Sequence, residues 1–292
     1  MHLEPRPSHV IVHITDTHLL EGGAPLHNTV DTVGHLRRAL ERAEESGLTI
    51  DAIVHTGDIA DLGELDAYRR ARAIIEPTAA RLGCPIIWIA GNHDQRGPLR
   101  EGIFDAEPTS EPVTSVTHVS GLRIIGIDTS VPGRGHGHLD EEQLAWLATE
   151  LAAPAPAGTI LALHHPPVST QVRLLESFQL DNPHDLATAI EGSDVRALIA
   201  GHFHYGVTGT LDGRPVSVAT ATSYTVRVDS PAQGFNGFDA EQAINFIFVY
   251  ESSIAHVAAP LGINGLGING LSSNGLGIDD AVVSLPDGFF DS

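Results

Sequence analysis

The chain has 292 residues, of which 42% are hydrophobic and 18% charged, as is typical of a globular protein with one large domain or two small ones. Its formal net charge of -21 argues against a nucleic-acid partner, because such proteins normally present a basic face to phosphate. No stretch approaches the ~18 consecutive apolar residues of a membrane-spanning helix, so we expect no integral membrane segment. Cys84 is the single cysteine and the N-terminus lacks a secretory pattern, so we expect a cytoplasmic protein without an internal disulfide.

Short apolar runs rich in β-branched residues alternate with longer amphipathic stretches along most of the chain. The run 9–15 predicts a buried strand, and 29–46 predicts a helix, because its apolar residues recur at helical spacing. The same rhythm predicts strands at 50–55, 85–90, 122–127, 159–163, 195–200, 215–219 and 244–250, and helices at 64–82 and 140–152. Asp140 is expected to cap the helix that follows it. This alternation predicts a layered α/β domain.

The composition changes after residue 260. From Leu261 the chain reads LGINGLGINGLSSNGLGID, an imperfect repeat of Asn-Gly-Leu in which the Asn-Gly pairs favour turns. The segment is too short and too rich in glycine to form a core of its own. We therefore expect a main domain over residues 1–260 and a Gly/Asn-rich C-terminal extension over 261–292, to which we assign no chemistry.

Polar side chains follow five of the predicted strands, at the point where each strand ends. They form the motifs Asp16-Thr17-His18, Gly57-Asp58, Gly91-Asn92-His93-Asp94, His164-His165-Pro166 and Gly201-His202-Phe203-His204. In α/β folds, ligands gather at the carboxyl ends of strands, where loops project side chains from a rigid sheet. We therefore expect the five motifs to meet at one site.

Taken singly, each motif has a structural explanation. An Asp-x-His sequence is usually a capped turn or a surface loop, and Gly-Asp is a weaker signal still. A histidine after a buried strand is more often a satisfied core residue than a ligand. The five motifs together, in order and each at a strand end, favour a metal site instead.

The residue types indicate what this site would bind. Asp16 and His18, like His202 and His204, are two positions apart, and an extended backbone would point both side chains of such a pair to one side. Carboxylate, amide and imidazole ligands together suit Fe, Mn, Zn or Co. The candidate ligands are more than one metal ion needs, so we predict two divalent or trivalent ions that share Asp58.

The five motifs match, in order, those of the calcineurin-like metallophosphoesterases, and the chain resembles that superfamily over residues 16–204. The wording DTH, GDIAD, GNHD, HHPP and GHFH, together with the chain length, is most similar to the bacterial class III cyclic nucleotide phosphodiesterases. The resemblance implies a four-layer α/β/β/α sandwich around a dinuclear metal centre, and makes residues 1–260 the catalytic domain. It also implies a possible homodimer.

The resemblance assigns the metal ligands in two sets that share one carboxylate. The first set comprises Asp16, His18, Asp58 and His204, and the second comprises Asp58, Asn92, His164 and His202.

The resemblance also assigns roles to residues that would hold no metal. His93 matches the family's active-site histidine that is not a ligand, and Asp94 is expected to orient it, so both are predicted as catalytic residues. Asn92, His93 and His204 are expected to contact the substrate. His165 is expected beside the ligands, either supporting one of them or simply packed nearby.

These groups suit phosphodiester hydrolysis. We expect a hydroxide that bridges the metal ions to attack phosphorus, while His93 protonates the leaving alkoxide. The leading prediction is a cyclic nucleotide phosphodiesterase of the cAMP type, whose partner is a small phosphodiester and whose product is a nucleoside monophosphate. The alternatives are a glycerophosphodiesterase, a broad-specificity phosphodiesterase or phosphomonoesterase, and a metal-binding scaffold without catalysis. The scaffold is disfavoured because every predicted ligand and His93 are present.

Other polar residues belong to none of these motifs. The loop 133–138, which carries His136 and His138, is expected to be solvated rather than to cap the substrate. Tyr205 suits packing as well as stacking on a base, and Arg123 is expected at an edge or on the surface.

Overall fold

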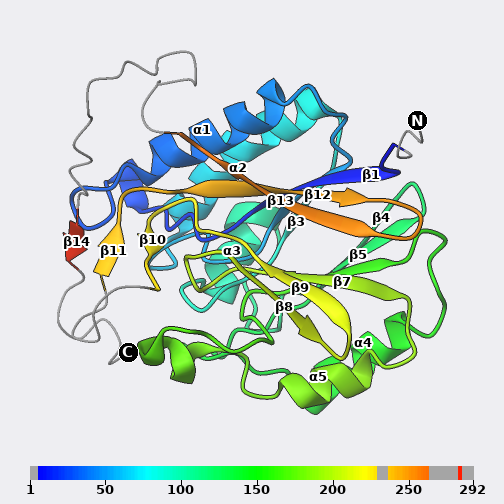
Figure 1. The fold of residues 1–292 in the computed structure, drawn as a ribbon. Helices are drawn as coiled ribbons and strands as arrows, with labels where there is room; N and C mark the ends of the chain where they lie inside the picture. Colours follow the sequence, from blue (N-terminus) through cyan, green and yellow to red (C-terminus); the bar gives the residue numbers. More distant parts are fainter. Residues whose placement is uncertain (1–5, 229–235, 263–281, 285–292) are drawn as a thin grey trace.

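Two β-sheets lie face to face in the computed structural model, with helices on the outer side of each sheet (Figure 1). The structure describes residues 6–228, 236–262 and 282–284. The layers follow the order helix, sheet, sheet, helix, which confirms the predicted four-layer α/β/β/α sandwich. No helix of the described residues is long and apolar enough to cross a membrane.

The first sheet has five strands, in the order β13 (Ile254–Pro260), β12 (Ala243–Val249), β1 (His9–Ile14), β2 (Ala52–His55) and β3 (Ile86–Trp88). The second sheet has six, in the order β4 (Ser115–Val119), β5 (Leu122–Gly126), β6 (Thr159–Ala162), β7 (Val195–Ala200), β9 (Arg214–Val218) and β8 (Val207–Leu211). A small third sheet joins β10 (Thr225–Val226), β11 (Asn236–Phe238) and β14 (Val282–Ser284).

The helices connect these strands. They are α1 (Thr32–Glu45), α2 (Leu65–Leu82), α3 (Arg96–Phe104), α4 (Glu141–Glu150) and α5 (Pro183–Ala189), with 3-10 turns η1 (Glu21–Gly23) and η2 (Arg173–Phe178). Helix α1 begins three residues later than 29 because Asp31 caps it, accepting a hydrogen bond from Gly34 N at 2.8 Å. Asp140 caps α4 as expected, in a capping box with Gln143.

Strand β1 illustrates why the strands of the first sheet are rich in apolar residues on both faces. Val10, Val12 and Ile14 pack in the core that contains residues of α1 and α2, whereas Ile11 packs between the two sheets. Successive side chains of a strand point to opposite faces, so a strand buried on both sides reads as a continuous apolar run. A third core fills the space between the second sheet and α4 and α5.

Parallel pairing brings the ends of the motif-bearing strands to the same edges. Strands β1, β2 and β3 are parallel neighbours in the first sheet, and β6 and β7 are parallel neighbours in the second. Each of these five strands leads into one of the polar motifs. The fold thus delivers the five motifs from two sheets to one region.

Arg123 is not at an edge, contrary to expectation. It lies on β5, between β4 and β6, and is only 5% exposed. Its Nη2 lies 2.6 Å from Asp194 Oδ1 and its Nε donates to Thr159 Oγ1 at 2.8 Å. The pairing with Asp194 offsets the cost of burying the charge.

The C-terminal extension predicted over 261–292 lies mostly outside the described residues. Of that segment the structure describes 261–262 and β14, which pairs antiparallel with β11. The domain boundary at residue 260 stays a prediction.

Candidate metal centre

The loops after β1, β2, β3, β6 and β7 bring the predicted ligands together. The first sheet supplies four of them and the second supplies three. All are buried except Asn92, which is half-buried. They are Asp16, His18, Asp58 and Asn92 from the first sheet, and His164, His202 and His204 from the second.

The first predicted set of ligands forms a tight cluster. The ligand atoms of Asp16, His18, Asp58 and His204 all lie within 4.8 Å of one another. His18 Nε2 lies 3.2 Å from His204 Nε2 and 3.5 Å from Asp58 Oδ2. His204 Nε2 lies 3.4 Å from Asp16 Oδ1. Four ligand atoms at these separations can surround one ion.

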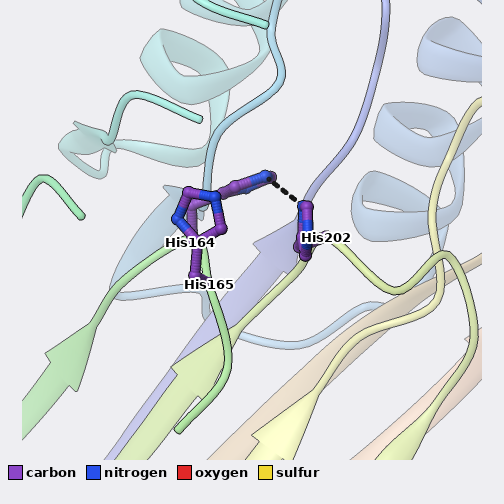
Figure 2. A group of neighbouring side chains, drawn as sticks. All are labelled: His164, His165 and His202. Carbon is purple, nitrogen blue, oxygen red and sulfur yellow. Dashed lines mark hydrogen bonds between the residues drawn. The ribbon is translucent and has the colours of Figure 1, made fainter. Parts of the chain in front are cut away.

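The second set converges on His164. Its Nε2 lies 3.3 Å from Asp58 Oδ2, 3.1 Å from Asn92 Oδ1 and 3.1 Å from His202 Nδ1. Figure 2 shows the His164 and His202 rings reaching toward each other from β6 and β7. Because Asp58 Oδ2 lies within 3.5 Å of a ring nitrogen in each set, it is placed to bridge two ions.

Hydrogen bonds at the far side of three histidine rings fix which nitrogen faces the cluster. His164 Nδ1 lies 2.7 Å from the Thr56 carbonyl oxygen, and His204 Nδ1 lies 2.9 Å from the Tyr224 carbonyl oxygen. His18 Nδ1 lies 2.9 Å from Asp61 Oδ1. These oxygens accept, so each Nδ1 carries the hydrogen and a neutral ring presents a lone pair at Nε2.

When the rings are neutral, lone pairs therefore face lone pairs within the cluster. The Nε2 atoms of His18 and His204 approach to 3.2 Å, and Nε2 of His164 faces the oxygens of Asp58 and Asn92. Acceptors at such distances repel one another unless a cation or a proton lies between them. The mixed oxygen and nitrogen donors suit borderline metal ions, so the residues fit the predicted dinuclear centre.

The electrostatics of the cluster also favour a positive charge at this point. Burial alone lowers the pKa of His164, but the charge of Asp58 raises it to about 9. Burial raises the pKa of Asp58, but His164 and His93 hold it well below its usual range. Burial and the neighbouring His164 lower the pKa of His202 to about 3. Asp58 thus stays ionised and attracts a cation.

The backbone at the ligands is not extended, which corrects the geometric expectation for Asp16-x-His18 and His202-x-His204. Five ligand residues have left-handed backbone angles, which non-glycine residues adopt rarely and which concentrate at functional sites. Their φ values are 53° at Asp16, 45° at His18, 51° at Asp58, 74° at His202 and 59° at His204. Tight turns, rather than the alternation of a strand, point these side chains inward.

One motif glycine makes room for the shared carboxylate. A Cβ atom on Gly91 would lie against Oδ1 and the backbone nitrogen of Asp58, much closer than van der Waals contact allows. Asp58 Oδ1 instead accepts a hydrogen bond from His93 N at 2.9 Å. Glycine at this position therefore lets the loop after β3 close over Asp58.

That Asp94 orients the His93 ring stays a prediction, and the charge of Asp94 is among those that raise the pKa of His93. The Asp94 carboxylate accepts hydrogen bonds from the backbone N–H groups of Ile59, Ala60 and Gly91 at 2.8 to 3.2 Å. It therefore fastens the loop after β2 to the loop after β3. A carboxylate held by backbone donors from two loops helps to fix the loops that carry the site.

Asp61, to which the sequence analysis gives no role, contacts the His93 ring. His93 Nδ1 lies 2.7 Å from the Asp61 carbonyl oxygen and 3.6 Å from its Oδ1, while the same Oδ1 accepts from His18 Nδ1. Asp61 thus contacts both a candidate ligand and the candidate proton donor. In the sequence, Asp61 is the second aspartate of GDIAD, three residues after Asp58.

His165 lies next to the ligands, as expected. It is fully buried, and its ring centroid lies 4.8 Å from that of His164 and 4.6 Å from that of His202 (Figure 2). Its Nδ1 lies 2.8 Å from Thr129 Oγ1, which holds the ring in place. The role of His165 stays a prediction.

The histidines of the loop 133–138 and Tyr205 bond residues outside the predicted ligand sets. His138 Nδ1 pairs with Asp181 Oδ1 at 2.7 Å, and His136 Nε2 lies 3.9 Å from Asp181 Oδ2, on an exposed part of the surface. The Tyr205 hydroxyl bonds Thr170 Oγ1 at 2.7 Å, and its side chain is 8% exposed, so Tyr205 packs within the fold.

Comparison with protein families identifies this arrangement. Residues 9–206 match the family model described as calcineurin-like phosphoesterase. That range includes every predicted ligand, together with His93 and Asp94.

Two bacterial relatives match most of the chain. A cAMP/cGMP dual specificity phosphodiesterase of Mycobacterium tuberculosis is 47% identical over 258 residues, which cover 88% of this chain and 81% of the relative. A probable cyclic nucleotide phosphodiesterase of Rhodococcus erythropolis is 45% identical, over 88% of this chain and 85% of the relative.

A solved structure shares the fold. A dimetal phosphatase from Danio rerio superposes with a TM-score of 0.59 at 16% sequence identity, covering 88% of this chain and 97% of that one. At this identity the likeness concerns the fold alone.

Proposed function

Because this chain belongs to the calcineurin-like phosphoesterase family, we propose that it hydrolyses cyclic nucleotides of the cAMP type to nucleoside monophosphates with two bound metal ions. The relatives that cover most of the chain are named for this activity or as probable enzymes of this kind. The observation that carries the proposal is the pair of acceptor clusters joined by Asp58 Oδ2. A buried arrangement of facing acceptors is stable around cations, which is what a dinuclear phosphoesterase requires.

The ligand sets expected from the resemblance suit the distances within the cluster. Two metal ions in such a site neutralise the charge of the phosphodiester and lower the pKa of water toward neutrality. We assign the first ion to Asp16, His18, Asp58 and His204, and the second to Asp58, Asn92, His164 and His202. The identity of the ions, among Fe, Mn, Zn and Co, stays a prediction.

His93 is the residue we assign to protonation of the leaving alkoxide. Burial lowers its pKa, but the charges of Asp58 and Asp61 raise it above the usual value. Its Nδ1–H donates to the Asp61 carbonyl, so Nε2 is the nitrogen that gains and loses the proton. The ring stands edge-on to that of His18, with centroids 4.7 Å apart, and its side chain is 22% exposed, so it can meet a substrate bound at the centre.

The remaining parts of the proposal follow from the same geometry. Asp94 supports the site through the loops that it joins, and Asn92, His93 and His204 are the residues expected to contact the phosphate. The substrate is a small phosphodiester. The homodimer and the cytoplasmic location stay predictions.

The test compares substrates on metal-loaded protein. Turnover of 3′,5′-cAMP, 2′,3′-cAMP, a glycerophosphodiester and a simple monoester would be measured with and without a chelator. Chelator-sensitive turnover that is highest on a cyclic nucleotide supports the proposal. Highest turnover on another ester would assign that ester class as the substrate. No turnover on any ester with both ions bound would favour the alternative of a metal-binding scaffold without catalysis.

A second arm tests His93. A His93→Gln protein that binds both ions should lose about 10²–10⁴-fold in turnover, the usual contribution of general acid catalysis. If that protein turned over cAMP at the wild-type rate, His93 would not be the proton donor.

A further inference from the structure

A cavity of about 580 Å³ opens beside the candidate metal centre. Asn92 and His93 line it; Asn92 belongs to the second ligand set, and His93 is the candidate proton donor. Its other walls come from three segments of chain, 94–98, 108–110 and 130–133. The volume falls in the ~300–1,000 Å³ range of small-molecule sites. A group attached to a phosphate at the centre can therefore extend into it.

Arg96, the second residue after Asp94, fixes both walls of this cavity. Its Nη1 donates to the Ser110 carbonyl oxygen at 2.9 Å and its Nη2 to the Ser130 carbonyl oxygen at 2.8 Å. Its Nε donates to Asp128 Oδ2 at 2.9 Å. Each wall is thus tied to the start of helix α3, which follows the His93 loop.

Asp128 bonds both Arg96 and the segments that form the cavity walls. It is fully buried, and besides Arg96 it accepts hydrogen bonds from Val113 N at 2.9 Å and Ser130 N at 2.8 Å. An ion pair between the half-buried Arg96 and the buried Asp128 holds the segments 108–113 and 128–131 at a fixed separation. The cavity is therefore shaped before a ligand arrives, which reduces the entropic cost of binding.

The lining suits a flat, uncharged group with polar edges. Apolar contact comes from Pro98, Pro108, Val131 and Pro132, and hydroxyl groups come from Thr109 and Ser110. The one carboxylate of the lining, Asp94, is bonded to backbone N–H groups of the neighbouring loops. Proline and valine can pack on the faces of a ring, while hydroxyls can bond its edge atoms and ribose oxygens.

We propose that this cavity is the nucleoside subsite, which takes the base and ribose of a nucleotide whose phosphate lies at the metal centre. The inference rests on the proposed function and adds where the nucleoside part binds. A glyceryl group is far smaller than the cavity and would leave most of the apolar lining in water. The size and lining therefore favour a nucleoside over the substrate of the glycerophosphodiesterase alternative.

The test separates the nucleoside from the phosphate by binding rather than turnover. AMP and inorganic phosphate would each be titrated calorimetrically into metal-loaded protein. The wild-type protein should bind AMP at least tenfold more tightly than phosphate. The double variant Ser110→Trp/Val131→Trp fills the cavity from two of its segments and should lose that preference while binding phosphate as before. Val131→Trp alone, on one wall, should lose part of it.

The matched control places the same side chain elsewhere. Val257 lies on β13 of the other sheet, is 45% exposed and does not line the cavity, so Val257→Trp should bind AMP and phosphate like the wild type. Wild-type protein that binds AMP no better than phosphate would overturn the subsite, as would a double variant with unchanged AMP affinity. Equal loss of AMP and phosphate affinity would also overturn it. Turnover of cAMP by the wild type tests the proposed function separately.

Discussion

Asp61 offers the sharpest test of how the metal centre is held. Its Oδ1 lies 2.9 Å from His18 Nδ1, and both side chains are largely buried, with exposed fractions of 12% and 1%. Asp61→Ala leaves the His18 Nδ1–H without its acceptor, so the ring can rotate away from the first ligand set. Loss of such a partner typically lowers metal affinity or activity about 10–100-fold. That range corresponds to about 1.4–2.7 kcal/mol of metal-binding free energy.

The assay is a calorimetric titration of metal-free protein with Mn²⁺ or Zn²⁺, which gives the affinity for each of the two ions. Asp61→Ala should lower the affinity for the ion bound by His18 more than the affinity for the second ion. Asp61→Asn keeps an oxygen that can accept from His18 and should retain most of the affinity. Asp66→Ala is the matched control, because Asp66 is 44% exposed and pairs with Arg70 on α2, away from the cluster.

The same variant carries a second readout. Asp61 raises the pKa of His93, so its removal should lower that pKa. His93 donates only while it is protonated, and the alkaline limb of kcat/KM should therefore move to lower pH in Asp61→Ala. Unchanged metal affinity together with an unchanged pH profile would refute the reasoning for both histidines.

Three further perturbations test other parts of the fold. Gly91→Ala places a Cβ against Asp58 Oδ1 and should abolish binding of at least one ion, which a metal titration would reveal; full metal content would contradict the packing argument. Removal of the ions by a chelator should lower the melting temperature, since ligands that bind only the folded state stabilise it, and an identical Tm in both states would count against a resident metal. His13 is fully buried, and burial lowers its pKa from 6.5 to about 3, so the unfolded chain takes up a proton there that the folded chain does not. The free energy of unfolding should therefore fall below pH 6.5 by about 1.4 kcal/mol per pH unit from this residue, and His13→Gln should flatten that slope in urea titrations; an equal slope would refute it.

The site was largely predictable because its signal is local. A polar residue directly after a buried strand stands out in the sequence, and parallel pairing then brings the ends of β1, β2 and β3 together. The role of Asp61 was not predictable in this way. It depends on the left-handed turn at Asp58, whose φ is 51°, and on the approach of His18 from another loop.

The parts of the fold that were missed lack that local signal. Helix α3 contains Gly97, Pro98 and Gly102, which weaken a helical pattern, yet it carries the arginine that fixes the cavity walls. Edge strand β4 is only partly buried and has no continuous apolar run. The partner of Arg123 is Asp194, 71 positions away in the sequence, so a charged residue inside a strand could not be placed without the fold.

The division of the ligands between two sheets bears on the order in which the protein folds and binds its metal ions. His18 and His204 are 186 positions apart, and the ligands from the second sheet lie in the loops that follow β6 and β7. An ion that binds both residues closes a very long loop of chain, which costs conformational entropy. Ion binding alone therefore cannot drive formation of the first sheet. We therefore expect the metal ions to bind after the two sheets have packed together, when the fold is already complete. Refolding kinetics that are the same with and without ions, followed by a separate metal-dependent phase, would bear this out.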